Sequence, residues 1–338
     1  MDLQTFWFCC LGFLLAGYAV QDGYDLGAGM LHPLAKDDAE RRVIYNAIGP
    51  FWDGNEVWLV AFGASLFAAF PDAYAAVFSG FYIPFMLLLL SLILRAVSIE
   101  FRGKLPSELW RRFWDRVFFG ASLGASVLFG VAAGNLIAGV PVDSERIIAA
   151  GLSDLLSPFP LLMGLVTAAL FAMHGACFLC VKTEGHLQAR IHLWRKRILL
   201  AFLVLYLVAL VSIMARNGSA AEHLRDRPFV GLFAAAGLML AAGAFREAHL
   251  GRGLRALGAS SLIVLMSVAV FCGCLYPDLV PSSLDPAWSL DVWNAASSSK
   301  TLRIMAAVAL IGLPLAVAYS VFMHLAFRGK VRIENTSY

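Results

Sequence analysis

Nine stretches of about 20 mostly apolar residues recur along this chain, and each is long enough to cross a bilayer as a helix. Backbone polar groups find no water inside a bilayer, so such stretches fold as helices. The chain is 60% hydrophobic and 14% charged, whereas a soluble domain carries about 25% charged residues. We therefore predict an all-α, polytopic membrane protein. The predicted helices are approximately 5–28, 53–70, 74–95, 117–139, 158–181, 198–215, 228–245, 256–276 and 302–327.

Basic residues between the spans predict the orientation, because cytoplasmic loops carry an excess of Lys and Arg. Alternate segments hold 20 of the 26 basic residues, which places the N-terminus outside and the C-terminus in the cytoplasm. These segments are 29–52, 95–116, 182–197, 246–255 and 328–338. The first span should be retained, because no basic stretch precedes it as in a signal peptide. We expect residues 1–338 to form a single transmembrane domain, with stretch 277–301 as an outer cap or an interaction surface.

Acidic side chains occur at the ends of the first two spans, where an ionised carboxylate is costly and functional roles are common. Asp22 and Asp25 are three residues apart and share a helix face, and Asp53 and Glu56 repeat that spacing in the next span. Asp22 is about 17 residues into the first span, or roughly 26 Å along a helix. We therefore expect all four carboxylates to converge near the cytoplasmic boundary and to line a proton route.

Simpler interpretations of these residues stay open. Asp53 suits an N-cap, where a carboxylate interacts favourably with the positive end of a helix. All four acids could also be helix-end residues solvated by cytoplasmic water. Trp52 and Trp58 fit an interfacial aromatic belt, and packing against a quinone ring is the alternative.

Other chemistries find less support in the sequence. His174 is the one histidine well inside a span, which favours a hydrogen-bonded structural role over haem ligation. Cys177 and Cys180 stand two residues apart at lipid depth, where small apolar packing is the simpler interpretation. No phosphate-binding loop or zinc spacing occurs. Basic residues do not gather with aromatics in one patch, so we predict no nucleic-acid partner.

Two motifs of this chain resemble those of a known protein family. The runs Asp22-Gly-Tyr-Asp25-Leu-Gly27-Ala-Gly29-Met-Leu and Gly49-Pro-Phe-Trp52-Asp53-Gly54-Asn55-Glu56-Val-Trp58-Leu resemble the signature of subunit II of cytochrome bd quinol oxidases. Later matches to the same pattern are Phe78-Ser-Gly-Phe-Tyr, Arg95 through Glu100-Phe-Arg102, and Lys182-Thr-Glu184-Gly. The resemblance covers the whole chain. Its compact length is similar to that of the cyanide-insensitive branch.

The resemblance implies two four-helix bundles and one peripheral helix in the bacterial inner membrane. It also implies a heterodimer with subunit I, which holds two haems b and one haem d and oxidises quinol while reducing oxygen to water in aerobic respiration. This subunit would have no catalytic haem, would support haem assembly and would contribute a cytoplasmic proton channel. Asp53 would be the main channel acid, accompanied by Asp22, Asp25 and Trp58, and Glu56 joins the same route by its helical spacing from Asp53. Trp52 and Asn55 are candidates for a quinone or interface contact.

A structural quinone and a small single-helix subunit stay open as further components. The alternative function is a proton-coupled secondary transporter, in which the same acids bind protons alternately with a solute. Paired inverted halves and interrupted helices, which are typical of transporters, are not evident in the sequence.

Overall fold

The computed structural model describes residues 2–216 and 219–333, and parts of the expected loop 216–227 and of the expected cytoplasmic segment 328–338 lie outside these residues. Helices dominate, and the strands among the described residues form one short antiparallel pair. Helices long and apolar enough to cross a membrane are α1 (Leu3–Leu31), α5 (Tyr82–Phe101), α6 (Glu108–Ala138), α8 (Pro158–Lys182), α9 (Gly185–Met214), α11 (Pro228–His249), α12 (Gly253–Leu275) and α13 (Ser299–Ala326). The all-α prediction is confirmed.

A bent pair of helices brings the candidate crossings among the described residues to nine if the pair is taken as one span. Helix α3 (Trp52–Ala69) and helix α4 (Pro71–Gly80) meet at 119°, and α5 starts a separate helix after Phe81. The predicted span 74–95 therefore began too early. Proline at the first position of α4 has no N–H to lose. The backbone N–H of Ser297 donates to the Ala69 carbonyl at 2.8 Å, and the Ser297 hydroxyl donates to the Ala68 carbonyl at 2.7 Å, so the end of α3 is satisfied.

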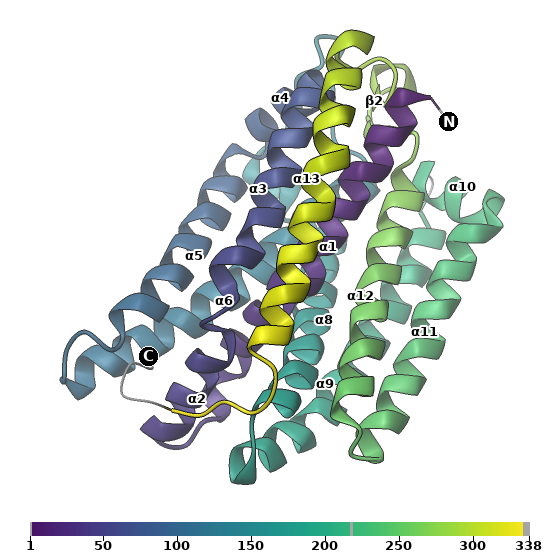
Figure 1. The fold of residues 1–338 in the computed structure, drawn as a ribbon. Coiled ribbons are helices and arrows are strands. Elements are labelled where there is room, and N and C mark those ends of the chain that lie inside the picture. The colour runs from purple at the N-terminus through teal and green to yellow at the C-terminus, as the bar shows by residue number, and fades with distance from the viewer. Residues whose placement is uncertain (1, 217–218, 334–338) are drawn as a thin grey trace.

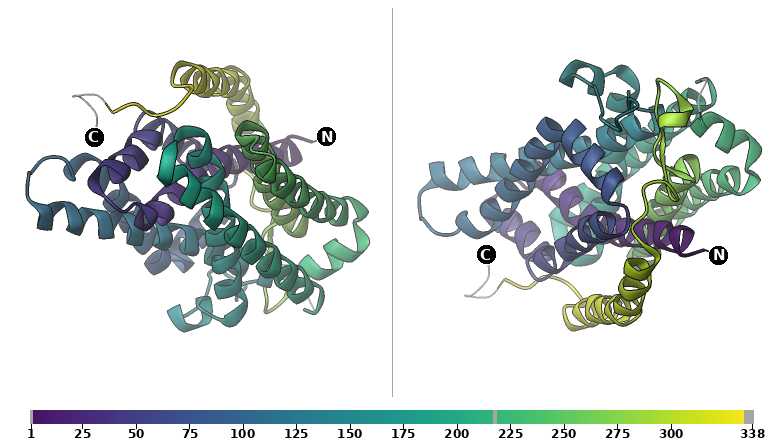
Figure 2. Two further views of the ribbon diagram at one scale, coloured as in Figure 1. Left: turned by 90° about the horizontal axis from the view of Figure 1, so that it is seen from below. Right: turned by 90° about the horizontal axis from the view of Figure 1, so that it is seen from above.

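The crossing helices form two groups. Helices α1, α3, α5 and α6 pack together, α8, α9, α11 and α12 form the second group, and α1 and α6 contact α8 where the groups meet (Figure 1). Both views in Figure 2 place α13 at the edge of the molecule, and Leu302 is its one buried residue. These observations agree with the expected bundles and peripheral helix. One hydrophobic cluster contains side chains from both groups.

Glycines allow α1 and α8 to approach closely where the two groups meet. A Cβ atom added to Gly27 would lie 2.0 Å from the Phe171 carbonyl oxygen and 2.8 Å from the Gly175 Cα atom. One added to Gly23 would lie 2.9 Å from the Phe171 ring. The Gly23–Gly27 pair is thus a small-residue contact that no larger side chain would allow.

Elements outside the spans lie at the two ends of the molecule. The upper end in Figure 1 carries α7 (Leu152–Leu155), α10 (Ser219–Asp226), β1 (Asp278–Val280), η2 (Pro286–Trp288) and β2 (Leu290–Asp291). Segment 277–301 is an ordered cap there, because the Val140 N–H donates to the Pro281 carbonyl at 3.0 Å and the Ser282 hydroxyl to the Val142 carbonyl at 2.8 Å.

The lower end carries η1 (His32–Leu34) and the amphipathic helix α2 (Asp38–Ile48), where the sequence predicted a turn. Asp37 caps α2 by accepting from the Glu40 N–H at 2.8 Å, and the Glu40 carboxylate accepts from the Lys36 N–H at 2.7 Å. The expected loop 182–197 is also mostly helical, because α9 begins at Gly185 and not near 198. Basic residues do not break a helix at the edge of a membrane, so hydropathy alone places the start of a span too late.

Candidate functional site

A fully buried arginine connects three of the spanning helices near the lower end. Arg95 of α5 donates from Nη1 to Asp22 of α1 and from Nη2 to Glu56 of α3, each at 2.5 Å. Arg95 and Asp22 are entirely shielded from solvent, and the Glu56 side chain is partly exposed. A planar guanidinium binds two carboxylates at once. Nothing in the sequence shows that α5 faces the acids of α1 and α3, so this role of Arg95 could not be predicted.

Asp25 lies next to this ion pair in an equally buried position. The amide nitrogen of Asn55 on α3 donates to the Asp25 carboxylate at 2.7 Å and also lies 3.0 Å from the Tyr24 hydroxyl. One oxygen each of Asp22 and Asp25 has no hydrogen-bond partner among the described residues. We call Asp22, Asp25, Asn55, Glu56 and Arg95 the Arg95 cluster. It holds three carboxyl groups and one guanidinium.

A hydrogen bond connects Tyr24, which neighbours this cluster, to the peripheral helix α13. The Tyr24 hydroxyl lies 3.2 Å from Nε2 of His324 near the end of α13, and Nδ1 of His324 lies 2.8 Å from the Ser320 carbonyl. Because a carbonyl only accepts, Nδ1 carries the proton, and in a neutral ring Nε2 then accepts from Tyr24. Tyr24 is buried and stacks on Phe178 at 4.1 Å between ring centroids, whereas His324 is exposed. The sequence analysis had not singled out Tyr24 or His324.

Asp53 does not join the other three acids, so the expectation that four carboxylates converge is wrong on this point. It lies in the first turn of α3, and the N-cap position belongs to Phe51. The Asp53 side chain is exposed and makes no hydrogen bond or ion pair with the described residues. Its side of α3 continues into Val57 and Val60, which are 56% and 69% exposed. Asp53 therefore stands at the end of an outward-facing apolar stripe at helical spacing.

The two tryptophans of the second motif lie apart from the carboxyl groups. Trp58 is buried about one helical turn after Asn55 along α3, and it packs with Leu14 and Tyr18. A Cβ atom on Gly17 would lie 2.2 Å from the Trp58 ring, so glycine is required there. Trp52 is half-buried in the apolar cluster formed with α2. Both positions are explained by apolar packing, and contact of these tryptophans with a quinone stays a prediction.

His174 has the hydrogen-bonded role expected from the sequence. Its Nδ1 lies 2.8 Å from the Ser260 hydroxyl and its Nε2 lies 2.8 Å from the Val20 carbonyl. The Val20 carbonyl fixes the proton on Nε2, so in a neutral ring Nδ1 is an acceptor for the Ser260 hydroxyl, which also lies 2.8 Å from the Leu257 carbonyl. With both nitrogens engaged, His174 does not fit the requirements of an axial haem ligand. Among residues 2–216 and 219–333, no group of three or more His, Cys, Asp and Glu side chains could hold a metal ion.

A second charged cluster, which the sequence analysis missed, lies closer to the lower surface. Asp115 of α6 accepts from Arg102 Nε at 2.6 Å and from Arg41 at 3.3 Å, and Arg102 also donates to Asp38 at 2.7 Å. Burial alone would raise the pKa of Asp38, but the hydrogen bond and charge of Arg102 lower it below its usual value. Burial raises the pKa of the neighbouring Tyr45 phenol.

Comparison with known proteins agrees with this architecture. The family model described as cytochrome bd terminal oxidase subunit II matches residues 3–327. Cytochrome bd-I ubiquinol oxidase subunit 2 of Escherichia coli (strain K12) is 33% identical, with 98% of this chain and 96% of that protein covered. Cytochrome bd ubiquinol oxidase subunit 2 of Bacillus subtilis (strain 168) is 34% identical, with 98% and 97% covered.

The fold also matches a solved structure. The bd oxidase from Geobacillus thermodenitrificans gives a TM-score of 0.79 at 17% identity, covering 97% of this chain and 99% of the matched chain. The family model spans almost the whole sequence, and two relatives exceed 30% identity over nearly their full lengths. This multi-pass inner-membrane protein therefore belongs to the cytochrome bd terminal oxidase subunit II family.

Proposed function

We propose that this chain provides part of the cytoplasmic proton route of a quinol:oxygen oxidoreductase, with Asp53 at the intake and the Arg95 cluster behind it. The relatives are named as subunits of ubiquinol oxidases, and reduction of oxygen to water consumes protons. The partner subunit I would hold two haems b and one haem d, which supply oxygen reduction when bound. The engaged nitrogens of His174 support this assignment of the haems to the partner.

The excess of carboxyl groups over cations in a buried site carries the proposal. With all three carboxyl groups ionised, Asp22, Asp25 and Glu56 would leave two negative charges uncompensated by Arg95. An unpaired charge is costly away from water, and binding a proton removes that cost. The partnerless oxygens of Asp22 and Asp25 offer places for such a proton or for a bridging water.

The position of Asp53 supports a role at the surface that meets subunit I. It stands at the lower end of the molecule beside the exposed valines of α3. A partner covering this apolar stripe would enclose the carboxylate and connect it with the exposed side of Glu56. Arg95 acts as a positioning residue here, because it fixes Asp22 and Glu56 and donates no proton itself.

Several finer features belong to the same proposal. The excess of basic residues supports a cytoplasmic lower end and an external N-terminus. Support of haem assembly in subunit I would come from the rigid contact between the two helix groups. A structural quinone, a small single-helix subunit and membership of the cyanide-insensitive branch stay predictions. The transporter alternative receives no support from the family.

Steady-state turnover tests the proposal. In the purified two-subunit oxidase, Asp53→Asn should lower quinol-driven oxygen consumption at least tenfold while the haem absorption spectrum stays unchanged. Glu145→Gln is the matched control, because Glu145 is an exposed acid at the opposite end of the molecule. Equal turnover in Asp53→Asn and the control would remove Asp53 from the route.

A further inference from the structure

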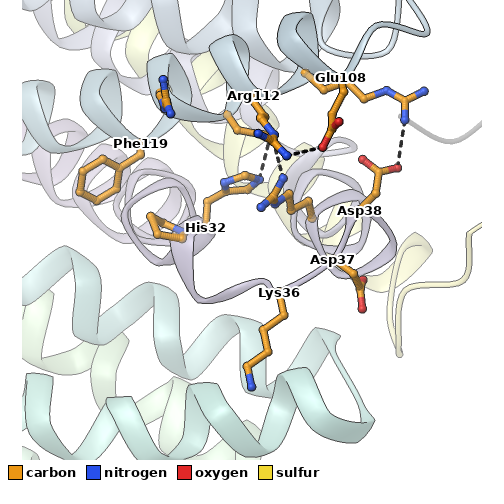
Figure 3. Close-up of a pocket in the computed structure, with 12 residues that line it drawn as sticks. His32, Lys36, Asp37, Asp38, Glu108, Arg112 and Phe119 are labelled. Carbon is orange, nitrogen blue, oxygen red and sulfur yellow. Dashed lines mark hydrogen bonds and ion pairs between the residues drawn. The ribbon is translucent and has the colours of Figure 1, made fainter.

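A cavity of about 710 Å³ opens between η1, α2 and the start of α6 at the lower end of the molecule (Figure 3). Five basic residues line it together with four acidic ones. The basic residues are Lys36, Arg41, Arg111, Arg112 and Arg116. The cavity has no part in the proton route proposed above, so its function needs a separate explanation.

Three of the four acids of the cavity are paired with arginines, and the fourth, Asp37, caps α2. Asp115 accepts from Arg102, which is not part of the lining, as well as from Arg41. Glu108 pairs with Arg112 on the neighbouring turn of α6, as Figure 3 shows. The Arg116 side chain, in contrast, makes no hydrogen bond or ion pair with the described residues and is exposed. The cavity therefore offers positive charge that the protein itself does not neutralise.

An apolar surface continues from these cations into the membrane. Arg112, Arg116 and Phe119 recur at helical spacing along one face of α6, and all three line the cavity. The same face continues to Leu123, which is 36% exposed. A Cβ atom on the adjacent Gly120 would meet nothing within 4 Å, so this side of the helix is open. From Arg112 to Leu123 the helix rises roughly 16 Å, from the aqueous boundary into the lipid layer.

We infer that this cavity binds the phosphate of an anionic phospholipid, with an acyl chain lying along Phe119, Gly120 and Leu123. Arginine forks match phosphate oxygens in geometry and charge, and basic pockets beside transmembrane helices recognise anionic head groups. Free phosphate carries the same negative charge and could bind the arginines, but it would not contact the apolar face of α6. A net-neutral phospholipid would use the apolar face but gain less from the arginines.

Lipid binding to the assembled oxidase tests the inference. The delipidated complex is titrated with fluorescent phosphatidylglycerol, and phosphatidylcholine serves as the neutral probe. The variant Arg112→Gln/Arg116→Gln should bind phosphatidylglycerol about 25-fold more weakly, at about fivefold for each cation removed. Haem absorbance should not change, because both arginines are solvent-exposed. Arg328→Gln is the matched control, since Arg328 is exposed near the same end and outside the cavity.

A second variant separates lipid from free phosphate. Gly120→Leu should fill the open apolar face and weaken phosphatidylglycerol binding while leaving any binding of inorganic phosphate unchanged. Equal phosphatidylglycerol affinity in the double variant and in Arg328→Gln would overturn the inference. Unchanged phosphatidylglycerol binding by Gly120→Leu, together with displacement of that lipid by millimolar inorganic phosphate, would identify a free anion as the ligand instead.

Discussion

The guanidinium of Arg95 lies 2.5 Å from the carboxylate of Asp22, and neither side chain is exposed to solvent. The pair ties α5 to α1, and Glu56 extends it to α3. Charges buried in this way stabilise a structure only while both partners are present, because each one alone would be an uncompensated ion. The pair therefore fixes the relative positions of the three helices that carry the acidic side chains.

Arg95→Gln should destabilise the protein severely. Removing one partner of a buried ion pair costs about 3–5 kcal/mol, so the assembled complex should melt at a lower temperature and accumulate poorly. The double variant Arg95→Gln/Asp22→Asn should recover part of that loss, since it removes the fully buried one of the two carboxylates that Arg95→Gln leaves without a cation. Thermal unfolding of the detergent-solubilised complex measures both effects. A double variant that is no more stable than Arg95→Gln would contradict this role of the ion pair.

Gly27→Leu should separate α1 from α8. Even the first carbon of the new side chain would overlap the Phe171 carbonyl and the backbone of Gly175, and backbone cannot rotate away as a side chain can. Overpacking of this kind costs about 1–3 kcal/mol or more. Gly63→Leu is the control, because a Cβ atom on Gly63 meets nothing within 4 Å. Equal melting temperatures for the two variants would show that the crossing is looser than the structure indicates.

His174→Phe should lower stability without altering haem absorbance. The Val20 carbonyl and the Ser260 hydroxyl would each lose a buried partner, although the hydroxyl keeps the Leu257 carbonyl. An unsatisfied buried group costs about 1–3 kcal/mol. Denaturation of the purified complex measures the loss, and a visible spectrum provides the second readout. A shifted or missing haem band in correctly assembled complex would point to ligation instead.

Asp38→Asn should make the complex less sensitive to acid. Contact with Arg102 lowers the pKa of Asp38 below its usual value, so the contact stabilises the folded state above that usual value. The stabilisation is lost as the pH falls through the lowered pKa of the folded state. The difference in melting temperature between wild type and variant should therefore shrink between pH 6 and pH 3. A difference that is constant with pH would exclude a contribution from this titration.

Hydropathy predicted eight spans to within a few residues at most of their ends, because twenty apolar residues leave few alternatives in a bilayer. It failed where polar segments are helical. Residues 38–48 form the amphipathic helix α2, and α9 begins before its apolar part. It also placed one span across the break at Phe81, because α4 is itself apolar and no polar segment separates it from α5.

The acids of the site could be found from the sequence, because carboxylates inside apolar spans are rare and easily recognised. Their partners could not. Arg95 is the last residue of the span predicted at 74–95, like any boundary arginine, and its contact with Asp22 joins residues 73 positions apart. Helix spacing placed Asp53 and Glu56 on one side of α3, but the side that faces α1 depends on packing between helices, which a single sequence does not give.

Proton uptake tests the central claim most directly. The assembled oxidase is reconstituted into vesicles, and rapid mixing with oxygen starts the reaction. A pH indicator on the side of the lower face then reports how fast protons are taken up. Asp53→Asn should slow uptake from the lower face at least tenfold, although the haems are oxidised at the wild-type rate in the first step. Wild-type uptake in Asp53→Asn, measured in complex with full haem content, would contradict a proton route through this subunit.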